Sequence, residues 1–344
     1  MARPQDLARL EAAFTTSLAG ATPDTQQELR RIARYRAPPP AIDYPKQRLA
    51  AVLVLLHLDK HGELAVTLTT RSSKLRSHPG ETSLPGGRWE EGDGEGGEWT
   101  ALREAYEEIG LPLPPRQGQA DSDSPATPNS DAPLLYLTSL PAYTSRTLLV
   151  VLPIVYLLLQ PAETASTDCL PSFLRPNPDE VDAIFHLPLR SFLLLPESTS
   201  ASTGRTRFTY DHADYTWLLS RPYRLHAFSS PPPPPSSTAA SSSNPADSQP
   251  HSAVTGLTAD IVIDTALLAH YGTFDEGELP ADAVGFQRRA EGQMEWTEIV
   301  QEALKVQKNG VGGIKGDASR ETGLGAKLDG ASGIEPSDTR SSAT

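Results

Sequence analysis

Three glutamates near residue 105 have the spacing best suited to chemistry. Glu104, Glu107 and Glu108 stand at i, i+3 and i+4, so a helix over 95–109 places their carboxylates on one face. Like charges at this spacing repel each other, and a hard divalent cation relieves the repulsion because it prefers oxygen ligands. The charge pattern alone is equally compatible with a solvated acidic face.

The rest of this helix is patterned to hold those carboxylates in place. Leu102, Ala105 and Ile109 fall at i, i+3 and i+7 and form a stripe that predicts burial. Gly110 suits the left-handed residue that ends many helices. Arg103 lies about 100° around the helix from Glu104. From there it can brace a carboxylate or the preceding loop by bidentate pairing.

The residues before this helix add to the pattern of candidate site residues. Pro85-Gly86-Gly87 lies upstream and gives a backbone that can approach phosphates closely. Glu95 is followed by seven residues and then by Arg-Glu-Ala-Tyr-Glu-Glu-Ile-Gly-Leu over 103–111. This arrangement resembles the box of the Nudix hydrolases, which cleave nucleoside diphosphates linked to another moiety. Seven residues separate Gly87 from Glu95 where the family usually has five, which indicates a loop insertion.

The resemblance implies roles for these residues. Glu104, Glu107 and Glu108 would bind magnesium or manganese, and Glu95, Arg103, Glu107 and Glu108 would form the catalytic set. The metal would polarise the diphosphate and lower the pKa of the attacking water. The group that accepts the proton from water stays open, because in this family the base lies either in the box or in a distant loop.

The segment before the box is similar to a second motif, which marks the coenzyme A diphosphatase branch of the family. Matching positions are Arg71, Ser72, Arg76, Gly80, Pro85, Gly86 and Gly87, with Leu84 where phenylalanine is usual. The resemblance implies substrate binding by Arg71, Ser72, Arg76, Gly86 and Gly87. Coenzyme A carries a 3′-phosphate, and Arg71, Lys74, Arg76 and His78 supply a cationic cluster for it. The alternative is a basic loop that balances the glutamates.

The implied reaction is hydrolysis of coenzyme A or acyl-CoA to 3′,5′-ADP and 4′-phosphopantetheine or its acyl form. Two alternatives stay open: a Nudix diphosphatase acting on ADP-ribose or another nucleoside diphosphate derivative, and a non-catalytic Nudix-fold scaffold. Residues 177–185 and 256–259 extend the resemblance. Asp179 and Glu180 are candidates for a further ligand or base, and pairing of Glu180 with a basic residue is an equal alternative.

The elements that position these residues predict an α+β fold, an α/β/α sandwich with a mixed sheet between helices. Strands are predicted over 50–58, 64–70, 134–140 and 147–159, with strand or edge elements over 192–195 and 208–219. Helices are predicted within 5–35 and over 95–109 and 258–271. The predicted organisation is an N-terminal helical extension (1–44), a Nudix domain (45–272) with low-complexity insertions near 116–132 and 229–252, a C-terminal helical segment (273–307) and a disordered tail (308–344).

Composition narrows the functional classes further. A net charge of -13 argues against a general nucleic-acid binder. The single cysteine, Cys169, excludes an internal disulfide, which fits a reducing compartment. No stretch reaches the roughly 20 apolar residues of a membrane span. We expect an intracellular protein, with peroxisome, mitochondrion and cytoplasm left open. Pro231 to Pro235 is a linker or, less readily, an SH3-type ligand.

Overall fold

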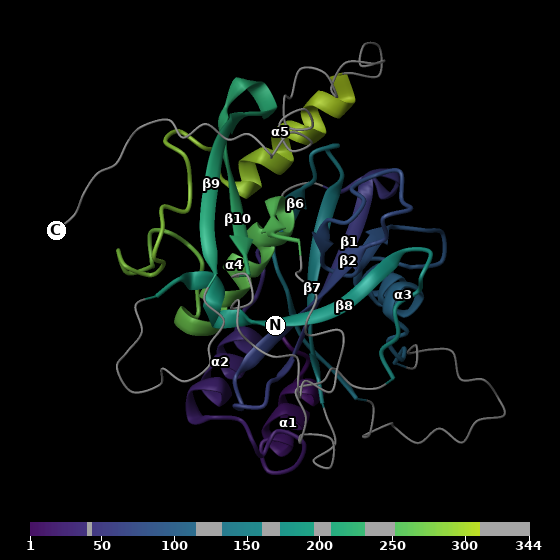
Figure 1. Ribbon diagram of the computed structural model, residues 1–344, viewed down its shortest axis with the longest axis vertical. Coiled ribbons are helices and arrows are strands. Elements are labelled where there is room, and N and C mark those ends of the chain that lie inside the picture. The colour runs from purple at the N-terminus through teal and green to yellow at the C-terminus, as the bar shows by residue number, and fades with distance from the viewer. Residues whose placement is uncertain (40–42, 115–132, 160–172, 196–207, 231–251, 310–344) are drawn as a thin grey trace, which may run out of the picture.

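The computed structural model describes residues 1–39, 43–114, 133–159, 173–195, 208–230 and 252–309. Its main feature is one sheet of eight strands: β1 (Leu49–Leu58), β2 (Leu64–Arg71), β3 (Thr82–Ser83), β4 (Gly86–Arg88), β5 (Leu134–Ser139), β6 (Tyr143–Thr144), β7 (Val150–Leu158) and β8 (Val181–Pro188). The central order is β3-β2-β1-β7-β5, with β4 beside β1, β6 beside β7 and β8 beside β2. Among the strands that the structure describes, only β1 and β7 pair in parallel, which confirms the predicted mixed sheet (Figure 1).

Strand β1 is buried on both faces of this sheet. Leu53 and Leu55 pack with the apolar stripe of α3 (Glu98–Ile109). Val54 and Leu56 belong to the opposite cluster, which they share with α4 (Gly256–Tyr271). All four side chains are fully buried, so helices cover both faces and the predicted sandwich is confirmed. Because side chains alternate along a strand, one continuous apolar run serves both faces.

Two helices precede the sheet, as predicted for residues 5–35. They are α1 (Pro4–Ala13) and α2 (Pro23–Arg34). Leu29 and Ile32 on α2 are fully buried within the cluster that contains α4. Arg31 donates hydrogen bonds to the carbonyl oxygens of Ala269 and His270 at the end of α4. The N-terminal helices therefore share their core with the sheet.

A smaller antiparallel sheet lies beside α4 (Figure 1). It consists of β9 (Thr209–Thr216), β10 (Pro222–Ser229) and β11 (Val254–Thr255), in the order β11-β10-β9. Phe228 of β10 and Val254 of β11 are almost fully buried in the main cluster. We call these three strands the accessory sheet. The sequence predicted a strand near β9, but it did not predict β10, β11 or β8.

Some segments differ from the structure predicted for them, and others lie outside the residues that the structure describes. Residues 192–195 do not form a strand: Leu189–Leu193 is a short 3-10 helix whose Phe192 is fully buried, so its apolar run reflects core packing. Within the predicted C-terminal helical segment, α5 (Trp296–Asn309) is helical and 273–295 consists of turns and irregular chain. The insertion predicted near 116–132, most of that near 229–252 and nearly all of the 308–344 tail lie outside the described residues.

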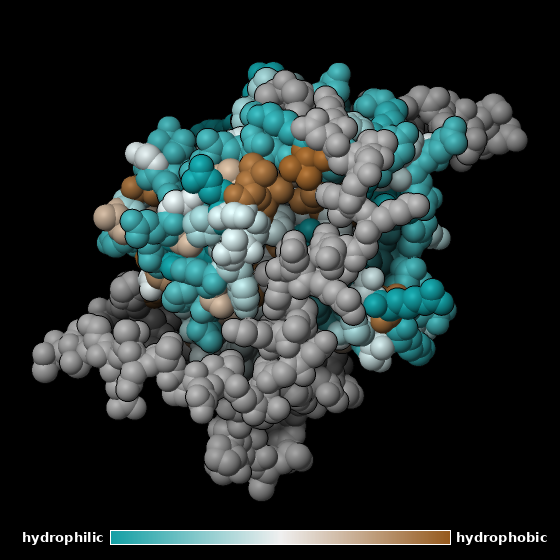
Figure 2. Space-filling view, turned by 90° about the horizontal axis from the view of Figure 1, so that it is seen from above, coloured by the Kyte–Doolittle hydropathy of each residue, from teal (hydrophilic) through white to brown (hydrophobic). Residues whose placement is uncertain are grey.

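The surface fits the acidic, polar composition. Figure 2 shows a face that is mostly hydrophilic, with a small hydrophobic patch. Among the helices that the structure describes, none combines the length and apolar content needed to cross a bilayer.

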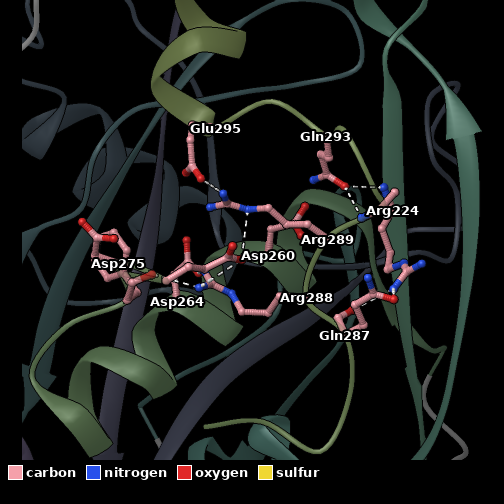
Figure 3. A network of polar contacts seen from close by, with 12 residues as sticks. Arg224, Asp260, Asp264, Asp275, Gln287, Arg288, Arg289, Gln293 and Glu295 are labelled. Carbon is pink, nitrogen blue, oxygen red and sulfur yellow. Dashed lines mark hydrogen bonds and ion pairs between the residues drawn. The ribbon is translucent and has the colours of Figure 1, made fainter. Parts of the chain in front are cut away.

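A buried polar network joins α4, the accessory sheet and the chain before α5 (Figure 3). Asp264 of α4 accepts hydrogen bonds from the hydroxyl of Tyr143, at 2.6 Å, and from the guanidinium of Arg288. Asp260 accepts a hydrogen bond from the hydroxyl of Tyr223. Arg224 of β10 binds the side chain and carbonyl oxygen of Gln287. The network holds the accessory sheet against α4.

Asp264→Ala should therefore destabilise the fold strongly. It leaves the hydroxyl of Tyr143 and the guanidinium of Arg288 without their acceptor in a buried site. Removing one partner of a buried ion pair costs about 3–5 kcal/mol, which a urea titration would measure as a lower free energy of unfolding. The control is Glu302→Ala, which removes an exposed ion pair with Lys305 worth about 0–1 kcal/mol. Equal effects of the two substitutions would contradict the assignment.

Candidate active site

The backbone at Gly86 approaches β1 too closely for any side chain, and the backbone at Gly87 lies against the carboxylate of Glu104. A Cβ on Gly86 would lie 2.4 Å from the carbonyl oxygen of Ala51, and one on Gly87 would lie 2.4 Å from the carboxylate carbon of Glu104. Gly86 has a φ of 157°. Glycine is required at Gly86 because β4 pairs closely with β1, whereas a side chain at Gly87 would displace the Glu104 carboxylate on α3. The predicted pair of glycines thus meets the predicted carboxylate helix.

Glu108 is the most buried of the three box glutamates, with 6% of its surface exposed. Its Oε2 accepts a hydrogen bond from the backbone N–H of Gly86 at 3.1 Å. Burial raises the pKa of Glu108 to about 8, and the negative charges of Glu104 and Glu180 act in the same direction. The hydrogen bond from Gly86 and the charge of Arg71 oppose that shift. Because burial disfavours the ionised form of Glu108, a positively charged ligand would stabilise that form strongly.

Glu104 and Glu107 extend the acidic face toward solvent. The side chain of Glu104 is 16% exposed and that of Glu107 is 47% exposed. Both pair with Nη1 of Arg103, at 3.1 and 3.0 Å. Burial raises the pKa of Glu104, although Arg103 lowers it. The structure therefore brings together three predicted glutamates and the predicted arginine.

Arg103 also holds the loop that leads into the helix. Its Nε and Nη2 donate to the two carboxylate oxygens of Asp93, each at 3.0 Å, and Nη2 also donates to the carbonyl oxygen of Arg88 at 2.9 Å. Asp93 is only 3% exposed and accepts the N–H of Glu90. The bidentate pairing predicted for Arg103 is present. No local sequence pattern distinguishes Asp93 from the other acidic residues of this loop.

Glu95 occupies a different environment. Its side chain is 84% exposed and pairs with Nζ of Lys46 at 2.7 Å. The helix begins three residues later at Glu98, whose Oε1 accepts the hydroxyl of Tyr156 at 2.5 Å. The structure does not place Glu95 with the glutamates of α3, so its catalytic role stays a prediction.

Three predicted substrate residues lie at the end of β2 or in the loop that follows it, and they differ in exposure. Ser72 is fully buried, and its N–H donates to the carbonyl oxygen of Glu180 at 2.8 Å. Arg76 is exposed. The Nε of Arg71 is buried without a hydrogen-bond partner among the described residues. A buried, unpartnered guanidinium nitrogen whose charge acts on Glu108 suits an anionic ligand at this site.

A segment from distant sequence closes the end of the helix. The N–H of Arg175 donates to the carbonyl oxygen of Ile109 at 2.9 Å, and that of Asn177 donates to the carbonyl oxygen of Glu108 at 2.8 Å. These bonds satisfy carbonyl groups at the helix C-terminus. They also bring Glu180 near enough for its charge to raise the pKa values of Glu104 and Glu108. Glu180 thus belongs to the acidic site, whereas Asp179 is near Lys74 at 4.0 Å.

The chemistry of the three box glutamates suits a divalent cation, but in this structure their side chains do not form a complete site. In the described part of the chain, no three His, Cys, Asp or Glu side chains are arranged to hold a metal ion as they stand. Glu107 is turned toward Arg103 in a half-exposed pair, and such pairs contribute about 0–1 kcal/mol. Its release to a cation beside Glu104 and Glu108 is therefore inexpensive. All three are oxygen ligands of the type that magnesium and manganese prefer.

Several known proteins are similar to this chain in sequence. Residues 47–142 match the family model described as the NUDIX domain. Peroxisomal coenzyme A diphosphatase 1 of Saccharomyces cerevisiae is 30% identical over 285 residues, which cover 74% of this chain and 81% of the yeast protein. The peroxisomal coenzyme A diphosphatase of Caenorhabditis elegans is 38% identical over 154 residues, 45% of this chain and 53% of the relative. The mitochondrial Nudix hydrolase 15 of Arabidopsis thaliana is 40% identical over 149 residues, 43% of this chain and 42% of the relative.

The chain therefore belongs to the Nudix hydrolase family. It spans about half of the length of the worm and plant relatives.

Glu108→Gln should stabilise the metal-free protein at high pH. Because the folded-state pKa is raised above the usual 4.5 to about 8, the carboxylate lowers stability increasingly as pH rises from 4.5 to 8. An amide removes this dependence, so the variant should exceed wild type in free energy of unfolding at pH 8 and match it near pH 5. Urea titrations in a chelator would measure both. A difference that does not change with pH would contradict the burial of the carboxylate.

Proposed function

We propose that this chain hydrolyses the diphosphate bond of coenzyme A or acyl-CoA, giving 3′,5′-ADP and 4′-phosphopantetheine or its acyl form. The observation that carries the proposal is the meeting of a buried carboxylate helix with the loop that contains Arg71. The Nε of Arg71 is buried and unpartnered in the described structure, and its charge acts on Glu108. The names of the worm and yeast relatives, both coenzyme A diphosphatases, support the same substrate.

The proposed cation is magnesium or manganese, held by Glu104, Glu107 and Glu108. When bound, it supplies positive charge at the diphosphate and makes the attacking water more acidic. Glu108 is oriented for this role by the N–H of Gly86, and Glu104 by its contact with Gly87. Glu180, whose charge reaches both glutamates, is our candidate for a group that accepts a proton from water.

The protein's own residues also bind and orient the substrate in this proposal. Arg71 would pair with a phosphate through the nitrogen that lacks a partner in the described structure. Lys74 and Arg76 are exposed on the same loop and are placed to meet a further phosphate. Arg103 is fully engaged with Asp93 and the box glutamates. We therefore assign Arg103 to holding the loop and helix together and leave phosphate binding to Arg71.

The test of the substrate is product formation with magnesium on coenzyme A, dephospho-coenzyme A and ADP-ribose, resolved by chromatography. Fastest release of 3′,5′-ADP from coenzyme A supports the proposal. Fast cleavage of ADP-ribose alone would replace the substrate assignment while keeping the chemistry. Cleavage of none of the three would favour a non-catalytic role.

Glu107→Gln should lower kcat by at least about a hundredfold with the fold intact, because a neutral amide binds a hard cation much more weakly than a carboxylate. Circular dichroism would check the fold, and metal titration would show the accompanying loss of affinity. Glu302→Gln on α5 is the matched control and should retain wild-type kcat. Near-normal turnover by Glu107→Gln would remove this residue from the metal site.

Arg71→Ala tests the substrate loop separately. It should raise KM for coenzyme A by roughly tenfold or more, the value of one charge-assisted hydrogen bond of about 1.5–3 kcal/mol. Comparison with dephospho-coenzyme A identifies the phosphate that Arg71 contacts. A larger loss with coenzyme A assigns Arg71 to the 3′-phosphate, and equal losses assign it to the diphosphate. No change in KM for either substrate would show that Arg71 does not bind them.

A further inference from the structure

The loop that carries the predicted substrate residues is held from two sides. We call residues 71–83, from the last residue of β2 to the end of β3, the substrate loop. On one side, the N–H of Ser73 donates to Oδ2 of Asp182 at 2.9 Å, next to the bond between Ser72 and Glu180. Within the loop, the N–H of Arg71 donates to the carbonyl oxygen of Glu81 at 2.9 Å and the N–H of Gly80 donates back to Arg71 at 3.0 Å. These bonds fix the ends of the loop to each other.

On its other side the substrate loop is bound by one residue from far along the chain. The hydroxyl of Thr82 donates to the carbonyl oxygen of Ser252 at 2.8 Å. The hydroxyl of Ser252 donates to the carbonyl oxygen of Gly80 at 2.5 Å. Thr82 is only 5% exposed, so loss of its acceptor would leave a buried hydroxyl unsatisfied. Ser252 thus clamps the two residues on either side of Glu81.

Ser252 lies two residues before β11, a strand that is held between β10 and α4. Two residues later Val254 pairs with Phe228 of β10, and both side chains are almost fully buried. Strand β11 then continues directly into α4 at Gly256. A loop residue anchored next to a buried strand and a buried helix has little freedom to shift.

Strand β10, which pairs with β11, is itself held by polar contacts, and its Arg224 belongs to the network in Figure 3. His226 of β10 donates from Nε2 to the carbonyl oxygen of Arg288 at 2.9 Å, while its Nδ1 accepts the hydroxyl of Tyr210 at 2.8 Å. This donor and acceptor pair needs a neutral imidazole, and burial lowers the pKa of His226 to about 4. Arg224 on the same strand is held by both carboxylate oxygens of Asp214, each at 2.7 Å.

We propose that Ser252 and Thr82 are positioning residues for substrate recognition: the accessory sheet uses them to hold the substrate loop in the conformation that directs Arg71 toward the carboxylate helix. The inference rests on the proposed function, because it assigns the loop to substrate binding. Neither residue belongs to the box or to the substrate motif. Their effect is exerted through the backbone of Gly80 and Glu81, which is bonded to that of Arg71.

The test uses Ser252→Ala and Thr82→Val in the full chain. Each should raise KM for coenzyme A by roughly five- to tenfold, the value of one or two neutral hydrogen bonds, and leave kcat within about twofold. Thr82→Ser keeps the hydroxyl and should restore wild-type KM. Ser229→Ala on the neighbouring strand β10 is the matched control and should leave KM unchanged.

Amide hydrogen exchange separates this inference from the proposed function. Exchange over 72–82 should rise in Ser252→Ala and Thr82→Val, and exchange over α3 should not. Unchanged exchange in the loop would overturn the inference even if the wild-type protein cleaved no coenzyme A. With an active wild type, an unchanged KM, or a fall in kcat at constant KM, would also overturn it, because a positioning role in binding predicts neither.

Discussion

The active site depends on one close approach, that of the backbone at Gly86 and Gly87 to the carboxylates of α3. No side chain fits at Gly86, because a Cβ would meet the backbone of β1, and a side chain at Gly87 would displace the carboxylate of Glu104. The N–H of Gly86 is thereby free to bind Glu108. Strand β4 is only three residues long, and its pairing with β1 sets the position of this backbone. The central strand of the sheet thus determines where the charged face of the helix meets the substrate loop.

Three long-range contacts keep this arrangement in register. Asp93 binds Arg103 and fixes the loop before the helix. Residues 175–177 bind the last carbonyl groups of α3 and place Glu180 near the box glutamates. Ser252 binds the substrate loop from the accessory sheet. Apart from the pair of Arg103 with Asp93, each contact uses the backbone on at least one side.

The same site carries an electrostatic cost. Glu108 is buried and Glu104 is partly buried one helical turn away, and burial raises the pKa of both. Arg103 offsets part of the charge but is itself shared among Asp93, Glu104 and Glu107. Functional sites commonly retain such unfavourable charge because the ligand that relieves it also performs the chemistry. The buried network around Asp264 differs, because its charged groups are paired within the protein.

The sequence by itself determined the local features of this protein. Spacings of three and four residues placed Glu104, Glu107 and Glu108 on one helical face, and apolar runs identified β1, β2, β5 and β7, because these patterns arise from the periodicity of a single element. Only the tertiary structure decided which residues from other parts of the chain contact these elements. Asp93, Glu180 and Ser252 join the site, and Glu95 instead pairs with Lys46, through contacts that no local period encodes. Likewise β8 and β10 have mixed polar sequences, and their strand character comes from pairing with β2 and β9.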